Sequence, residues 1–134
     1  MKIRELATLI RSFVAGAAAT LVDLAVLYTW VAVVGLSPRL ASLPALVAGG
    51  VVNFFGNRHF AFRARGGSLR RQAMLYAVTE LVALALNGLF YDAVVRSVHP
   101  SAIGAVVVRL ITTHVVFIAF SYPIWRKVFR PAVA

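Results

Sequence analysis

Four long apolar runs, separated by short polar breaks, make up most of the sequence. A helix that crosses the hydrocarbon core of a bilayer needs about 20 mostly apolar residues, and each run reaches that length. The pattern predicts spanning helices at residues 12–35, 40–60, 73–95 and 102–125. The expected fold class is therefore an all-α membrane protein with four transmembrane helices, forming a single domain over residues 1–134.

Turn-forming residues occupy the breaks between these runs. Gly35 and Pro38 delimit the first break, an Arg-, Gly- and Ser-rich loop covers residues 63–71, and a His-Pro pair closes the third break at Pro100. The first apolar run is much longer than the core of a signal peptide, which has about 7–15 residues. We therefore expect an uncleaved first helix.

The two halves of the chain resemble copies of one helical hairpin. Asp23 in LVDLAVLY falls opposite Asn87 in LALNGLFY, and NFFGNRHFAFR (residues 53–63) falls opposite FIAFSYPIWRK (residues 117–127) at nearly the same offset. Two such hairpins keep the same orientation in a membrane, as in transporters with parallel repeats. The alternative is that any two membrane hairpins share these features.

Composition supports the membrane interpretation. Hydrophobic residues make up 61% of the chain and charged residues only 13%, against about 45–50% and 25% in soluble domains. The formal net charge is +10, but the basic residues cluster between the apolar runs. That placement indicates topology signals first and phosphate contacts second, with no nucleic-acid partner. No cysteine is present, which excludes disulfides and thiolate chemistry.

The distribution of basic residues predicts the orientation. Eleven Lys and Arg residues flank one side of the four predicted helices and two flank the other, and basic residues favour the cytosolic side. Both termini are therefore expected in the cytosol, in a multi-pass protein of the inner (plasma) membrane. The eleven are Lys2, Arg4, Arg11, Arg58, Arg63, Arg65, Arg70, Arg71, Arg126, Lys127 and Arg130, and the two are Arg39 and Arg96.

Four ionisable residues lie well away from the ends of the predicted spans, where a charge costs about 2.5–3.5 kcal/mol on insertion scales. Counting a rise of about 1.5 Å per residue, Asp23 and Arg109 lie near the same depth, as do Glu80 and His114. These depths suggest two pairs, Asp23 with Arg109 and Glu80 with His114. Such pairs either lock helix packing or contact a substrate, and the sequence leaves both open.

Asparagines and small residues also stand within the spans. Asn53 and Asn87 flank the ionisable layer, where an asparagine either joins helices by hydrogen bonds or contacts a substrate. Ala41, Ala45 and Gly49 form a face of small residues that permits close helix packing. This face serves either a helix pair within the chain or a second copy, and a homodimer is expected.

The stretch at residues 53–63 is richer in polar groups than a membrane anchor needs. Asn57, Arg58, His59 and Arg63 stand among four phenylalanines. The planar guanidinium suits a phosphate, and it tolerates a partly dry site better than an ammonium does. The alternative is ordinary, since stop-transfer charges and aromatic belts occur in most membrane proteins.

The chain resembles the GtrA-like family of small four-helix membrane proteins, over nearly its whole length from RSFVAGAAATLVDLAVLY onward. The second half follows the pattern less well, because SYPIWRK stands where a second Asn-Arg motif would fall. The residues that carry the resemblance are Phe13, Gly16, Asp23, Asn53, Phe54, Asn57, Arg58, Phe60, Phe62 and Arg63.

The resemblance implies translocation of a polyprenyl-phosphate-linked sugar from the cytosolic to the outer leaflet for cell-envelope polysaccharides. It carries functional roles onto Asp23, Asn53, Asn57 and Arg58. We add Arg63, Glu80, Asn87, Arg109 and His114 as candidate substrate-binding residues on physical grounds. The expected partners are this lipid and the surrounding membrane lipids, with no cofactor, metal or catalytic residue.

Three other functions compete with translocation. A membrane anchor or assembly partner for a polyprenyl-phosphate glycosyltransferase would need no substrate site. A proton-coupled multidrug exporter would use a carboxylate such as Asp23. Cationic drugs, however, would be repelled by the arginines at the cytosolic ends of the helices and by Arg109. A glycosyltransferase would need an Asp-rich metal-nucleotide motif, which the four acidic residues do not form.

Overall fold

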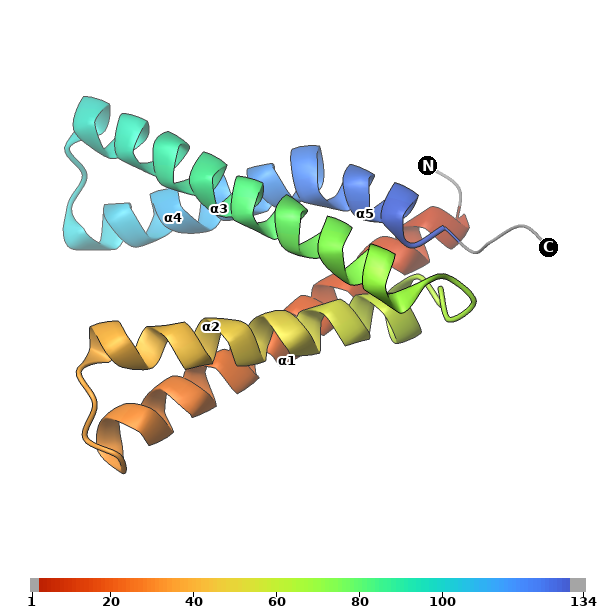
Figure 1. Ribbon diagram of the computed structural model, residues 1–134. Helices are drawn as coiled ribbons and strands as arrows, with labels where there is room; N and C mark the ends of the chain where they lie inside the picture. Colours follow the sequence, from red (N-terminus) through yellow and green to blue (C-terminus); the bar gives the residue numbers. More distant parts are fainter. Residues whose placement is uncertain (1–2, 131–134) are drawn as a thin grey trace. The chain divides into compact units, whose positions relative to one another are not determined.

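The computed structural model describes residues 3–130, and within that range the chain is helical apart from short connections (Figure 1). Four segments are long and apolar enough to cross a membrane. They are Ile3–Ala32, Leu40–Ala61, Leu69–Val98 and Val107–Val128. The predicted fold class, an all-α protein with four helices of spanning length, is confirmed.

Two of the helices contain 30 residues each, and both are longer than the apolar runs within them. Their polar ends carry arginines that continue the helix beyond the apolar run, so α1 and α3 begin before residues 12 and 73. The elements in chain order are α1 (Ile3–Ala32), α2 (Pro38–Phe55), the π-helical η1 (Gly56–Ala61), α3 (Leu69–Val98), α4 (Ala102–Val116), the π-helical η2 (Phe117–Ser121) and α5 (Tyr122–Val128).

The turn residues identified in the sequence set the helix ends. Ser37, Ser68 and Ser101 cap α2, α3 and α4, and each hydroxyl accepts a hydrogen bond from the backbone N–H three residues later at 3.2–3.4 Å. Gly35 after α1 and His99 after α3 have positive φ angles of 78° and 48°. Both residues therefore reverse the chain at the end of a 30-residue helix.

The chain forms two compact units. One contains α1, α2 and η1 together with Phe129, and the other contains α3, α4, η2 and α5. Six buried positions of the first unit correspond to buried positions of the second at a constant interval of 64 residues. This match supports the predicted duplication, because helical hairpins without a shared origin have no reason to bury the same positions. The buried pairs are Ser12 and Tyr76, Ala15 and Thr79, Ala19 and Ala83, Asn57 and Ser121, Arg58 and Tyr122, and Ala61 and Trp125.

Small residues bring α1 and α2 into close contact in the first unit. Ala41 and Ala45 are almost completely buried. A Cβ atom on Gly49 would lie 3.0 Å from the Cβ of Asp23 and 3.1 Å from the carbonyl oxygen of Ala19. The predicted small-residue face therefore serves a helix pair within the chain.

Replacing Gly49 with Leu is expected to lower the stability of the protein, because the new side chain must enter the contact between α1 and α2. Overpacking of this kind costs about 1–3 kcal/mol. Gly50 is the matched control, since a Cβ there meets no atom within 4 Å. Thermal unfolding of both Leu variants in detergent tests this contact, and equal melting temperatures would contradict it.

Candidate functional site

The first hairpin ends in a π-helical turn that buries two consecutive polar residues. The N–H of Phe62 donates to the carbonyl of Asn57 at 2.8 Å, and the N–H of Ala64 donates to the carbonyl of Arg58 at 2.7 Å. These bonds reach back five and six residues rather than four. Turns of this type are frequent at functional sites. Here Asn57 is completely buried and Arg58 is only 8% exposed.

Asn57 joins α1 to the end of α2. The hydroxyl of Ser12 donates to Oδ1 of Asn57. The side-chain amide of Asn57 donates to the carbonyl oxygen of Asn53 at 2.9 Å and to Oδ1 of Asn53 at 2.8 Å. A buried amide that is bonded in this way holds two helices together, so these contacts support the structural interpretation of the asparagines.

Arg58 holds the loop that follows η1. Its Nη2 donates to the carbonyl oxygens of Arg65 and Gly67, both at 3.1 Å. Its Nη1 lies 2.8 Å from Nε2 of His59, which must accept because a guanidinium only donates. Arg63, with φ at 54°, turns the chain within the same loop. The guanidinium thus fixes the position of residues 63–67.

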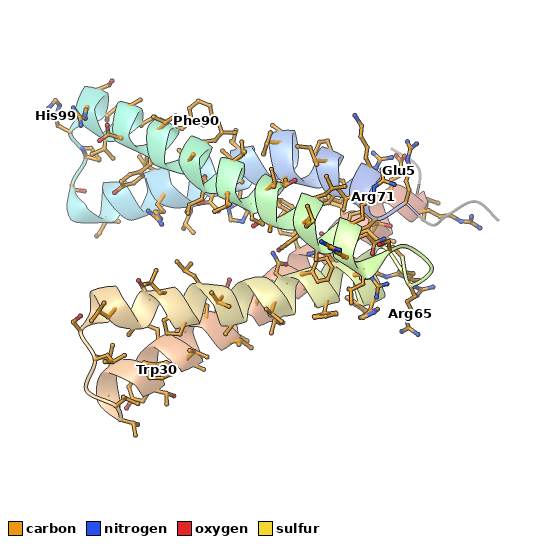
Figure 2. All side chains as sticks on the ribbon, viewed as in Figure 1. Glu5, Trp30, Arg65, Arg71, Phe90 and His99 are labelled. Atoms are coloured by element: carbon orange, nitrogen blue, oxygen red, sulfur yellow. The ribbon has the colours of Figure 1, made fainter. Side chains whose placement is uncertain are left out.

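The loop and η1 line an open depression of about 480 Å³ formed by His59, Phe60, Arg63 and Arg65. Both arginines are exposed, and Figure 2 shows Arg65 extending from the loop. The ring of His59 stacks on Phe55 with centroids 5.6 Å apart. Two exposed guanidinium groups beside aromatic rings suit an anionic group attached to an apolar chain.

The phenylalanines of this stretch have two different environments. Phe54 and Phe62 contact Phe129, with ring centroids 5.8 Å and 5.3 Å apart, and Phe129 has no exposed surface. Phe55 and Phe60 are 40% and 48% exposed. The first pair therefore anchors the segment after α5 in the first unit, and the second pair offers an apolar surface beside the depression.

The mid-span residues of the predicted ion pair belong to different units. Asp23 is half-buried on α1, in the contact with Gly49. Arg109 is exposed on α4, with its guanidinium carbon 5.7 Å from the centre of the Tyr91 ring. The pairing of Asp23 with Arg109 stays a prediction.

Glu80 and His114 both lie in the second unit. Oε1 of Glu80 is buried and has no hydrogen-bond partner among the described residues. Nδ1 of His114 lies 2.7 Å from the carbonyl oxygen of Leu110, to which it must donate. Asn87, on the same helix as Glu80, also has a buried Oδ1 without such a partner. The pairing of Glu80 with His114 stays a prediction too.

The first unit thus gathers part of the predicted site at one end. Asn53, Asn57, Arg58 and Arg63 lie in or beside η1. Sequence reasoning missed Ser12 as a partner of Asn57, because the two residues are 45 positions apart and no spacing rule connects them. It also left Arg65 out of the site, although its place in the basic loop was visible in the sequence.

The comparisons with known proteins give one match. The family model described as GtrA/DPMS, transmembrane domain, matches residues 11–125. No curated protein and no solved structure gives a significant match.

Replacing Arg58 with Lys is expected to loosen residues 63–67, because a single ammonium cannot reproduce the forked contact with two loop carbonyls. Hydrogen bonds to charged groups contribute about 1.5–3 kcal/mol each, so loop amide exchange should accelerate about tenfold or more. Hydrogen exchange of the loop peptide measures this effect. Arg70→Lys, an exposed substitution on α3, serves as the control, and unchanged exchange in Arg58→Lys would show that Arg58 does not hold the loop.

Proposed function

Because the chain belongs to the family of GtrA/DPMS transmembrane domains, we propose that it translocates a polyprenyl-phosphate-linked monosaccharide from the cytosolic to the outer leaflet. The family and the four spanning-length helices make it a multi-pass membrane protein of polyprenyl-phosphate-sugar processes. The positive-inside distribution supports an inner-membrane protein with both termini in the cytosol.

The depression beside η1 is the observation that carries this proposal. A phosphodiester in hydrocarbon is prohibitively unstable unless partners replace its water. Arg63 and Arg65 provide two exposed guanidinium groups at the end of a spanning helix. Phe55 and Phe60 provide exposed apolar surface for the first part of the polyprenyl chain. The phosphate of the lipid therefore binds here at the start of its passage.

Arg58 acts in this mechanism by positioning the loop. Its guanidinium donates to the carbonyls of Arg65 and Gly67, so it sets where the two exposed arginines stand. The family resemblance implies a functional role for Arg58, and holding this loop in place is such a role. Asn53 and Asn57 also help to position this loop, because their hydrogen bonds join α1 to the end of α2.

Beyond the entrance, polar side chains within the spans receive the headgroup. Asp23 accepts hydrogen bonds from sugar hydroxyls near mid-span, and Arg109 offers a guanidinium for the phosphate nearer the outer leaflet. His114 adds a polar group on α4. Each contact lowers the barrier locally without holding the lipid so tightly that its release fails.

The same Arg58 contacts favour a second candidate function. Because the guanidinium of Arg58 donates to carbonyls of its own loop, the basic residues around η1 can have a purely structural role. Under this alternative, the protein is an anchor or assembly partner of a polyprenyl-phosphate glycosyltransferase, and its lipid-facing helix surfaces contact that enzyme. A homodimer is compatible with either function.

Liposomes containing a polyprenyl-phosphate sugar distinguish the two candidates. A membrane-impermeant reagent reports how much of the lipid becomes accessible from outside over time. The native protein should raise this rate above that of empty liposomes. The double variant Arg63→Gln, Arg65→Gln should lower it about tenfold or more, since each charge-assisted hydrogen bond contributes about 1.5–3 kcal/mol.

The matched control is Arg4→Gln with Arg130→Gln, which removes two exposed cations outside the depression. It should move the lipid within about twofold of the native rate, because screened surface charges contribute little. An equal loss in both double variants would mean that net charge matters and the depression does not. A native rate equal to that of empty liposomes would refute translocation and favour the anchor function.

A further inference from the structure

The second unit contains buried polar atoms that the protein itself does not satisfy. Oε1 of Glu80, Oδ1 of Asn87 and Nε1 of Trp125 have no hydrogen-bond partner among the described residues. In the first unit, by contrast, the side chain of the buried Asn57 is hydrogen-bonded. A buried polar group without a partner costs about 1–3 kcal/mol, and native proteins contain few of them. Three in one unit therefore indicate a site for a polar molecule.

Two of these atoms, those of Glu80 and Asn87, lie on α3, and Trp125 lies on α5. Glu80 and Asn87 are seven residues apart, a spacing that puts both on the same helix face. Tyr76 is one turn before Glu80, and its ring stacks on Trp125 with centroids 5.2 Å apart. Tyr91 is one turn after Asn87 and lies beside Arg109. At a rise of about 1.5 Å per residue, this face extends for about 22 Å, most of the hydrocarbon thickness of about 30 Å.

At the interval of 64 positions, Glu80 and Trp125 have no polar or aromatic counterpart in the first hairpin, whereas the counterpart of Asn87 is Asp23. At three positions the first hairpin has a small residue where the second has a long polar or aromatic side chain. Ala45 and Ala61 are buried with 1% and 2% exposure, whereas the counterpart of Ala45 is the exposed Arg109. The corresponding positions, again 64 residues apart, are Gly16 and Glu80, Ala45 and Arg109, and Ala61 and Trp125.

We propose that this face of α3, together with Trp125 of α5, binds the sugar of the lipid headgroup, with Glu80, Asn87 and Trp125 contacting it at successive positions. The unsatisfied atoms are two acceptors and one donor. A sugar hydroxyl both donates and accepts, so a sugar that passes along this face can satisfy each of these atoms in turn. A phosphate only accepts and would be repelled by an ionised Glu80. A cation would leave the indole N–H of Trp125 without an acceptor. The identity of the carrier lipid rests on the proposed function, whereas sugar binding does not require translocation.

Intrinsic fluorescence provides a direct test, because the chain has two tryptophans, Trp30 and Trp125. Trp30 lies near the end of α1 (Figure 2), and Trp30→Phe leaves Trp125 as the sole reporter. This variant, in detergent, is titrated with polyprenyl phosphates carrying glucose, mannose, galactose or arabinose, and with polyprenyl phosphate that carries no sugar. At least one of the sugar lipids should change the Trp125 emission in a saturable way, and the sugar-free lipid should not.

Glu80→Leu and Asn87→Leu in the same background should each weaken the sugar-dependent response about tenfold or more. Leu keeps a membrane helix apolar, and a thermal melt of each variant verifies that it remains folded. Asp92→Leu is the matched control, because Asp92 is an exposed carboxylate on the same helix and its loss should leave the response unchanged. The inference is overturned if sugar-bearing and sugar-free lipids give the same response, or if the two Leu variants bind like the native side chains.

The fluorescence test and the liposome test can fail independently. A saturable, sugar-dependent response without lipid movement supports the sugar site and refutes translocation. Lipid movement without a sugar-dependent response supports translocation and refutes the sugar site.

Discussion

The close approach of α1 and η1 at Gly56 is the contact on which the end of the first hairpin depends. A Cβ atom on Gly56 would lie 2.9 Å from the Cβ of Ala15, so the two backbones meet there without a side chain between them. One residue later, Asn57 is close enough to α1 to accept the hydrogen bond from Ser12. The next residue, Arg58, then turns toward the loop and sets its arginines. A glycine, an amide and a guanidinium in consecutive positions therefore determine the geometry of the depression.

The two hairpins share an architecture but differ in the chemistry of their buried side chains. Equal buried positions preserve the architecture, and each copy has a 30-residue helix followed by a helix that runs into a π-helical turn. The chemistry at those positions has diverged. Where the first copy has the hydrogen-bonded Ser12 and Asn57, the second has Tyr76 and Ser121, and the ring of Tyr76 stacks on Trp125. Polar bonding closes the first hairpin near its π-helical turn, and aromatic stacking closes the second.

Features with a local cause could be predicted from the sequence. Hydropathy predicted the four spanning segments, and the turn residues predicted the breaks between them. The spacing of Ala41, Ala45 and Gly49 predicted a face of small residues, but the sequence left open whether its partner was α1 or a second copy. The role of Arg58 could not be predicted in the same way. This role depends on the wider π-helical turn of η1 and on the positive φ of Arg63. Neither feature changes the pattern of hydrophobic residues, so neither can be predicted from it. A basic residue after an apolar run looks the same whether it faces water or the carbonyls of its own loop.

The proposed substrate has two unlike ends, and the two copies differ in a corresponding way. A phosphodiester offers only acceptors and a negative charge, which the exposed arginines beside η1 can match. A sugar offers both donors and acceptors with no charge, which the neutral and acidic groups on α3 can match without cations. Two identical hairpins would present the same groups twice and so favour one end of the lipid. The two hairpins of this chain therefore present different chemistry, with exposed arginines beside η1 in one and neutral and acidic polar groups on α3 in the other.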